Sequence, residues 1–503
     1  MIRTRSSNSR RRAGPLRLLL LLAGSGAVFA ASDDESARIA QIVRPTSDFS
    51  RAEAYEVNPG GAATSHKPVN ISAFSNPSGN MSFERQLQFS VGDGVFRKLW
   101  VSAPSSTTSS DGLGPLFNAR SCQSCHLKDG RGRPPAPGEE AISMFLRVSI
   151  PPQTAEQREA LDSLKLAVIP DPTYGTQLQN YAVQGVPAEG RMHIEHVDVP
   201  VRFADGEVVH LQKPVYSAAD LQYGPLHPQA MLSARVAPPM IGVGLLEAID
   251  ADDILTWADP DDGNGDGISG RPNQVWSVEQ QRPMLGRFGW KAGEPSIAQQ
   301  SAHAFAGDIG ISSPLAPDPW GDCTEPENAC RSAPHGVYAD KRFEVAPDMF
   351  ELLVFYSRNL AVPARRKVGD KRVLEGKRLF YASGCASCHR PKYVTRRDLA
   401  LPEQSHQLIW PYTDLLLHDM GEGLADGRPE GLASGSEWRT PPLWGIGLTA
   451  TVSGHTQFLH DGRARNLLEA ILWHGGEAEA ARQRVVAMPK AEREALLAFL
   501  NSL

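Results

Sequence analysis

The sequence has little cysteine, no long apolar run and no excess of positive charge. The apolar stretch from Leu18 to Ala23 is much shorter than the roughly 20 residues that a membrane-spanning helix requires. No later segment has this character either, so we expect no membrane span. Lys and Arg total 51 against 57 Asp and Glu, a net charge of −6, which argues against a general affinity for nucleic acid or anionic lipid. The 503 residues are enough for two or three domains.

Four of the six cysteines stand in two copies of the motif Cys-x-x-Cys-His. The copies are Cys122-Gln-Ser-Cys125-His126 and Cys385-Ala-Ser-Cys388-His389. In this motif both thiols form thioether bonds to a haem, and the adjacent histidine ligates the iron. A zinc site or a redox-active Cys-x-x-Cys is the alternative, but both copies end in histidine. The sequence therefore predicts two covalently bound haem c groups.

The remaining cysteines, Cys323 and Cys330, are seven residues apart in a stretch rich in proline and glycine. This arrangement predicts a short structural disulfide. A catalytic dithiol is the alternative, but no neighbouring residue offers an obvious means of stabilising a thiolate.

Residues 1–30 have the pattern of an export signal. A region rich in arginine precedes the apolar stretch Leu18–Ala23, and Val28-Phe29-Ala30 supplies small residues around a cleavage point. Arg10-Arg11 also suits a twin-arginine signal, but we favour the ordinary secretory route because haem c is joined to an unfolded chain after export. We therefore expect a soluble mature protein in an oxidising compartment, the periplasm.

We expect a mainly α fold with two cytochrome c-type haem domains. Residues 31–365 would form the N-terminal haem domain and residues 366–503 the C-terminal one. Residues 31 to about 85 are polar and suggest a wrapping arm. Alternating apolar residues around 195–215, interrupted by Ala-Asp-Gly, predict a β-hairpin in a loop-rich insertion of the first domain. Helical periodicity occurs at residues 348–360, 371–381, 466–474 and 491–503.

A weak internal repeat relates the two halves of the chain. Arg235–Leu245 matches Arg439–Leu448 with one residue of slippage, and each copy follows a haem motif. A second pair of segments comes later in each half, Phe288–Gln300 and Leu459–Ala470. Two homologous haem domains are the economical explanation.

An acidic loop in the first half fits the opening of an EF-hand-type calcium loop. The expected calcium ligands are Asp262, Asn264, Asp266 and Ile268, and Gly267 stands at the turn position. Asn273 replaces the usual bidentate glutamate, and no clear helix pair flanks the loop. We expect a structural calcium ion, with an acidic surface turn as the alternative.

Four longer stretches carry a resemblance to a known family. They are Gly286–Gly293, Leu415–Asp426, Glu437–Gly445 and Leu459–Ala464. With the haem motifs, they resemble the di-haem cytochrome c peroxidase and MauG-like superfamily, and more closely its long branch of di-haem oxidoreductases, often labelled thiol oxidoreductases. The resemblance runs from about Gly112 to the C-terminus. It implies that the N-terminal haem reacts with peroxide and that the C-terminal haem transfers electrons, exchanged with a redox partner protein.

The resemblance also implies roles for residues between and beside the haems. Trp290 corresponds to the tryptophan that assists electron transfer between the haems, and Gln300 and Asp308 correspond to groups of the distal pocket. The family has glutamate ten residues after the glutamine, whereas this chain has Asp308 after eight. His303 is a second distal candidate. For Trp290 a plain core aromatic, and for Gln300 and Asp308 helix-surface polarity, are the alternatives.

On the far side of the C-terminal haem, His474 stands where family members have Met or Tyr. It would be the sixth iron ligand, giving a bis-histidine haem of lower potential than a His/Met haem. Met420 is the alternative ligand. His418 and His460 would orient loops or haem propionates, and Arg235 and Arg439 would pair with propionates.

Together these features predict an exported di-haem c-type oxidoreductase that resembles a peroxidase and acts on a small oxidant such as peroxide. The alternatives are a non-catalytic di-haem electron-transfer cytochrome and a MauG-like or thiol oxidase.

Overall fold

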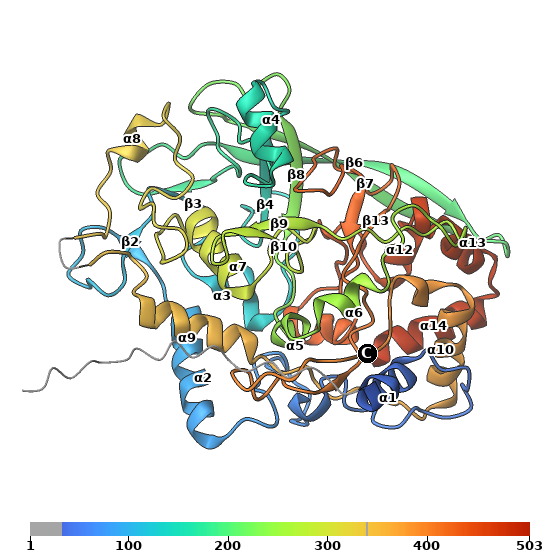
Figure 1. Ribbon diagram of the computed structural model, residues 1–503. Coiled ribbons are helices and arrows are strands. Elements are labelled where there is room, and N and C mark those ends of the chain that lie inside the picture. The colour runs from blue at the N-terminus through green and yellow to red at the C-terminus, as the bar shows by residue number, and fades with distance from the viewer. Residues whose placement is uncertain (1–32, 339–340) are drawn as a thin grey trace, which may run out of the picture.

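The computed structural model describes residues 33–338 and 341–503 (Figure 1). The predicted export signal, residues 1–30, lies outside the described residues. Within the described part all seven sheets have two strands, and helices and loops make up the rest. No helix in this part is long and apolar enough to cross a membrane. A mixed, mostly helical fold with small sheets is therefore confirmed, whereas the division into two domains near residue 365 stays a prediction.

The helices predicted from periodicity are present. They are α9 (Pro347–Arg358), α10 (Lys371–Ala382), α12 (Leu467–Leu472) and α14 (Lys490–Ser502). α9 starts with a proline in its first turn and buries Phe350, Leu353 and Val354, the three- and four-residue spacing of one helix face. α10 starts after Asp370, whose side chain accepts hydrogen bonds from the first free backbone N–H groups.

The sequence did not predict the helix α2 (Phe83–Phe96), which begins where the polar arm ends. Ser82 caps its first turn by accepting a hydrogen bond from the backbone N–H of Arg85. Its apolar residues do not follow a single buried face, because Phe83, Leu87 and Val91 are exposed to solvent. The usual amphipathic pattern is therefore weak in this segment.

Two helix crossings, α2 on α9 and α10 on α14, are built alike and are both visible in Figure 1. A Cβ added at Gly92 of α2 would lie 2.4 Å from the carbonyl oxygen of Leu352. A Cβ added at Gly376 of α10 would lie 1.9 Å from the carbonyl oxygen of Ala495. Each crossing therefore requires glycine at the contact, where the two backbones come closest.

Each crossing also supports one haem motif. Four residues after the contact glycine, Phe96 packs 6.2 Å from the ring of His126, and Phe380 packs 6.2 Å from the ring of His389. Matching helix pairs thus stand beside the two motif histidines.

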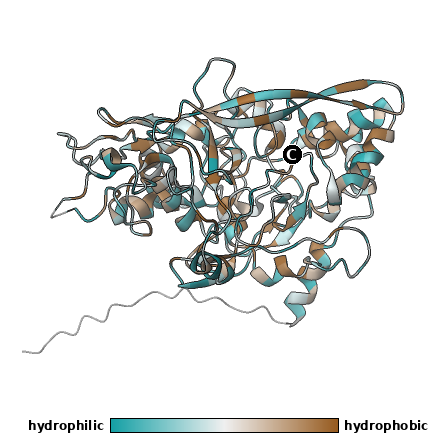
Figure 2. Cartoon of the chain, turned by 90° about the horizontal axis from the view of Figure 1, so that it is seen from above, coloured by the Kyte–Doolittle hydropathy of each residue, from teal (hydrophilic) through white to brown (hydrophobic). Residues whose placement is uncertain are grey.

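The predicted β-hairpin is confirmed and is longer than expected, with β6 (Arg191–Arg202) paired to β7 (Val208–Ala219). Figure 2 shows it as a long ribbon of alternating hydrophilic and hydrophobic residues along one side of the molecule. The hydroxyl of Tyr216 donates to Asp461 at 2.9 Å, and Asp205 near the turn is ion-paired with Arg493. The hairpin of the first half therefore lies on the second half.

The two main hydrophobic cores both draw residues from either side of residue 365. The second core contains Met144, Leu146 and Val148 of β4 (Met144–Ser149) together with Leu496 and Phe499 of α14. β4 is paired with β8 (Met231–Val236). The cores of the two halves are therefore shared.

The two copies of the first repeated segment pack against each other. Gly242 and Gly445 occupy equivalent turns with φ of 71° and 72°. A Cβ at Gly242 would lie 2.2 Å from the Trp444 ring, and a Cβ at Gly445 would lie 2.5 Å from the Ile241 side chain. A side chain of each copy therefore occupies the space that the glycine leaves in the turn of the other copy.

The second pair of segments has the same local structure in both halves. Backbone bridges join Phe288 to Glu294 and Phe458 to Ala464. Ser296 and Asn466 then cap α7 (Ile297–Ala304) and α12. The second copy thus begins at Phe458, one residue earlier than predicted, and in this register Ala304 of α7 corresponds to His474 after α12.

Candidate functional site

One internal cavity of about 570 Å³ reaches both Cys-x-x-Cys-His motifs. All four motif thiols are free of disulfides. Most of the predicted site residues line this cavity: Cys122, Cys125, His126, Cys385, Cys388, His389, His474, Trp290, Gln300 and Asp308, together with Arg235, Asp266, Ile268, His418, Met420, Arg439 and His460. The fold therefore brings residues from distant parts of the chain to a common space.

The three histidines predicted as iron ligands have the same hydrogen-bond arrangement. Nδ1 lies 2.8 Å from the Pro238 carbonyl in His126, 2.9 Å from the Tyr412 carbonyl in His389, and 2.7 Å from the Ala470 carbonyl in His474. Because a carbonyl only accepts, Nδ1 carries the proton and Nε2 is left with a free lone pair.

Burial keeps these imidazoles neutral. It lowers the pKa of His126 and of His389 to about 4, and it lowers the pKa of His474. A neutral imidazole whose second nitrogen is fixed by a backbone carbonyl is the usual form of a metal-ligating histidine.

Three buried arginines in the cavity wall supply positive charge without a carboxylate partner. Arg131, Arg287 and Arg439 have no ion pair among residues 33–338 and 341–503, and Nε of Arg131 has no hydrogen-bond partner. Burial lowers the pKa of each to about 10, so all three stay protonated near neutral pH. Unpaired buried cations require an anionic partner. Haem propionates would meet this requirement, and the residues present therefore fit two haem groups.

Arg235 already has carboxylate partners. Its guanidinium forms an ion pair of 2.8 Å with Glu430 through Nη1, and Nη2, which has no hydrogen-bond partner, lies 3.8 Å from Asp426. Pairing of Arg235 with a haem propionate stays a prediction.

Gln300 and Asp308 lie near the first motif, on α7 and on the π-helical turn η3 (Phe305–Ile309) that continues it. Nε2 of Gln177 donates to Asp308 at 2.9 Å. Burial raises the pKa of Asp308, while Arg147 and the Gln177 hydrogen bond lower it. No sequence pattern had selected Gln177 or Arg147. Arg147 lines the cavity from β4 and has no ion pair among the described residues.

His303, the second distal candidate, does not line the cavity. Its Nδ1 lies 2.5 Å from Glu294, and its side chain is 43% exposed. The residue of α7 that faces the cavity at the end of the helix is Ala304. Equivalent positions on the two helices thus provide an imidazole in the second half, His474, and a methyl group in the first.

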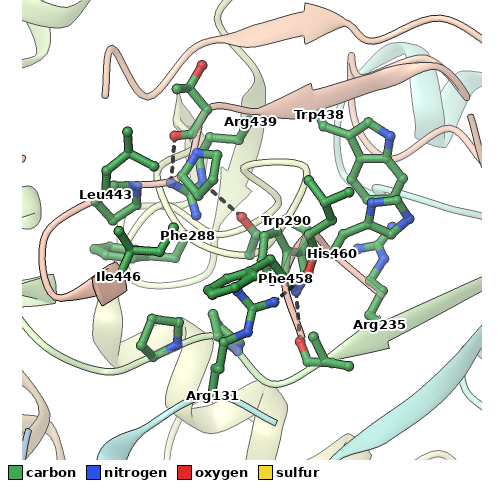
Figure 3. Close-up of a pocket in the computed structure, with 18 of the residues that line it drawn as sticks. Arg131, Arg235, Phe288, Trp290, Trp438, Arg439, Leu443, Ile446, Phe458 and His460 are labelled. Atoms are coloured by element: carbon green, nitrogen blue, oxygen red, sulfur yellow. Dashed lines mark hydrogen bonds between the residues drawn. The ribbon is translucent and has the colours of Figure 1, made fainter. Parts of the chain in front are cut away.

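Trp290 stands in the middle of the cavity wall among residues of both halves (Figure 3). Its Nε1 donates to the carbonyl of Val236 at 2.8 Å, and the backbone N–H of Arg439 donates to the carbonyl of Trp290 at 2.9 Å. The guanidinium of Arg131 lies 5.7 Å from the centre of its ring. These contacts fix the indole in one orientation.

The other two histidines of the cavity wall have fixed partners. His460 stacks on Trp438 with ring centres 3.6 Å apart, as Figure 3 shows, and burial lowers its pKa to about 3. His418 has Nε2 at 2.9 Å from Asp414 and Nδ1 at 2.6 Å from Glu477. Both nitrogens of His418 therefore have a carboxylate partner.

The acidic loop is folded by its own side chains. Asp262 accepts from the N–H of Gly267, Asn264 from Asp266, and Asp266 from Ile268. Asp259, which was not predicted, accepts from Gly263. Asp266 and Ile268 also line the cavity.

Cys323 and Cys330 are joined in a disulfide. They pack in a small buried cluster with Leu116 and do not line the cavity.

Comparison with known proteins gives one family and one solved structure. The profile of a family described as "Di-haem oxidoreductase, putative peroxidase" matches residues 54–503. A chain of Kuenenia stuttgartiensis hydrazine synthase, solved under 20 bar of xenon, is 13% identical, with coverage of 88% of this chain and 96% of that chain and a TM-score of 0.26. No curated protein matches the sequence.

Proposed function

The chain belongs to the di-haem oxidoreductase family, and we propose that it is an exported, periplasmic enzyme of peroxidase-like activity with two covalently bound haem c groups. In this proposal the haem at Cys122, Cys125 and His126 reacts with a small oxidant such as peroxide. The haem at Cys385, Cys388 and His389 transfers electrons, which it exchanges with a redox partner protein.

The observation that carries this proposal is the difference between Ala304 and His474. The two residues stand the same number of positions after the helix-capping residues, Ser296 and Asn466, and both line the cavity. The imidazole of His474 is suited to be a sixth iron ligand, whereas the methyl group of Ala304 cannot ligate. One closed and one open iron is the arrangement that an enzyme with one reacting haem and one electron-transferring haem requires.

The residues around the open side suit proton transfer to a bound oxidant. The haem, when bound, supplies the redox-active iron. Asp308 can take up and deliver a proton because burial raises its pKa. Gln177 fixes the Asp308 carboxyl by its hydrogen bond, and Gln300 offers an amide that can orient the oxidant. The free guanidinium of Arg147 would stabilise negative charge that develops there.

Trp290 is proposed as the residue that assists electron transfer between the haems. Support comes from its position in the cavity wall and from its bonds to both halves of the chain, to Val236 and to Arg439.

Replacing Ala304 by histidine tests the proposal. The new imidazole would stand where His474 stands in the second half, so the first iron should become six-coordinate. We expect the variant to lose its high-spin signal in electron paramagnetic resonance, its carbon monoxide binding and its peroxide reduction. The matched control is His303→Ala, one residue earlier on the outer face of α7, which should keep all three.

Two experiments distinguish the proposed function from the alternatives. A parent protein that binds no carbon monoxide when reduced would be an electron-transfer cytochrome with two closed irons. A thiol oxidase would depend on Cys323 and Cys330, but these are buried away from the cavity. Replacing both by serine should therefore leave peroxide reduction unchanged.

The acidic loop is proposed to bind a structural calcium ion through Asp262, Asn264, Asp266 and the carbonyl of Ile268. Three oxygen-bearing side chains at alternate positions, with a turn glycine, support this. Metal analysis of the dialysed protein should find one calcium per chain, and the Asp262→Asn variant should hold less.

A further inference from the structure

Glu477 joins three separate segments of the chain beside the second motif. It lies three residues after His474, on the short turn η6 (Gly476–Ala478). Its Oε1 accepts from the hydroxyl of Ser269 at 2.6 Å and from the backbone N–H of Asp419 at 3.1 Å. Its Oε2 accepts from Nδ1 of His418 at 2.6 Å and from the backbone N–H of Ser269 at 3.1 Å.

His418 continues this connection to the wall of the haem cavity. Its other nitrogen, Nε2, lies 2.9 Å from Asp414, and Nδ1 lies 3.6 Å from the sulfur of Cys388. His418 and Asp414 are almost completely buried. The hydrogen-bonded group Ser269–Glu477–His418–Asp414, which we call the Glu477 clasp, therefore runs from the acidic loop of the first half to the attachment site of the second haem.

The backbone beneath the clasp consists of closely packed glycines. A Cβ at Gly476 would lie 2.3 Å from the carbonyl oxygen of Asp419, and a Cβ at Gly421 would lie 2.7 Å from the backbone nitrogen of Gly476. Because glycines have no side chains to hold this contact, the hydrogen bonds of Glu477 fix the position of the turn η6.

His474 lies past the end of α12, which finishes at Leu472, and its backbone N–H donates to the carbonyl of Ile471 at 3.1 Å. The bond from its Nδ1 to Ala470 orients the ring but does not fix the backbone that follows it. The next anchor along the chain with bonds to other segments is Glu477.

We propose that Glu477 is the positioning residue that keeps His474 on the iron of the second haem, and that the Glu477 clasp thereby closes that iron to outside ligands. This inference rests on the proposed function, in which His474 is the sixth ligand. It adds that a segment of the first half, through Ser269, controls the coordination of the second haem.

The test is the number of carbon monoxide molecules bound per chain of reduced holoprotein, with the paramagnetic resonance of the oxidised protein as a second readout. The parent should bind one, at the first haem. Glu477→Ala should bind two and should lose the low-spin signal of the second haem. The milder Ser269→Ala variant, which loses a single hydrogen bond to a charged group, should speed carbon monoxide binding at the second haem by about 10-fold.

Glu479→Gln is the matched control, because Glu479 lies two residues further on and is ion-paired with Arg482 on the surface. It should behave as the parent does. His474→Ala separates the inference from the function on which it rests. If His474→Ala binds one carbon monoxide, the proposed ligand is wrong. If it binds two while Glu477→Ala and Ser269→Ala behave as the parent does, Glu477 does not position His474.

Discussion

Replacing Gly92 by alanine should loosen the α2–α9 crossing, whereas the same change at Gly94 should not. A Cβ at Gly92 meets the carbonyl oxygen of Leu352 at 2.4 Å and Cβ of Tyr356 at 2.7 Å, while nothing lies within 4 Å of a Cβ at Gly94. Each Gly→Ala change adds up to about 1 kcal/mol of stability through the higher helix propensity of alanine. Because both positions lie in α2, this contribution largely cancels when the two variants are compared. Overpacking costs about 1–3 kcal/mol. Gly92→Ala should therefore be less stable than Gly94→Ala by about that amount.

Urea unfolding of the holoprotein, followed by circular dichroism and by the haem absorption band, measures this difference. Phe96 contacts the His126 ring from the same helix, so both signals should move to lower urea concentration in Gly92→Ala. Gly376→Ala provides a second reading at the other crossing, where the contact is 1.9 Å. The close contact of the two helices would be refuted if the free energies of unfolding of Gly92→Ala and Gly94→Ala agreed within about 0.5 kcal/mol, the range of ordinary surface changes.

Three further predictions concern the buried polar groups and Trp290. Because the hydrogen bond from Gln177 lowers the pKa of Asp308, Gln177→Ala should move the acid limb of the pH profile of peroxide reduction to higher pH. An unmoved acid limb would count against Asp308 as the base that takes up a proton from the oxidant. Burial raises the pKa of Glu189 and of Glu327, so the folded protein keeps a proton that the unfolded chain loses above the ordinary glutamate pKa of 4.5. Stability should therefore fall as pH rises above this value, and urea unfolding of Glu189→Gln at several pH values should show a smaller decline than the parent protein. Trp290→Phe should slow stopped-flow electron transfer between the haems by roughly tenfold, or about 1.4 kcal/mol in the barrier, while carbon monoxide binding stays normal; an unchanged rate would make Trp290 a plain core residue.

Local patterns in the sequence were sufficient to predict the elements that depend on local chemistry. Apolar periodicity predicted α9 and α14. The two Cys-x-x-Cys-His motifs predicted a site at Cys122 and Cys385, and both residues line the cavity. The long hairpin was predicted from alternation and a turn signal. α2 was missed because several of its apolar residues face solvent, so its pattern lacks one clear buried face.

Residues whose position depends on distant segments could not be selected in this way. Arg147 lines the cavity because β4 pairs with β8, more than eighty residues later in the chain. Glu477 and Ser269 are joined across 208 positions. Glu477 belongs to no short motif, and Ser269 stands in the acidic loop at a position without a predicted ligand role. The correspondence between Ala304 and His474 was found only when the backbone bridges at Phe288 and Phe458 fixed the register of the two halves.

The two halves are also joined by an exchange of backbone hydrogen bonds. The N–H of Val236, in the first repeated segment, donates to the carbonyl of His460 in the second half at 2.8 Å. The N–H of Arg439, in the second repeated segment, donates to the carbonyl of Trp290 in the first half at 2.9 Å. His460 and Trp290 occupy equivalent positions when Phe288 is aligned with Phe458. The repeated segment of each half therefore donates a backbone hydrogen bond to the equivalent loop of the other half.

This exchange agrees with the two main hydrophobic cores, which both draw residues from either side of residue 365. It also bears on electron transfer, because Val236 bonds both to the indole nitrogen of Trp290 and to the backbone of His460. A hinge motion between the halves would have to break these bonds together. If His474 ligates the second iron as proposed, its release would therefore leave Trp290 and its bonds to Val236 and Arg439 in place.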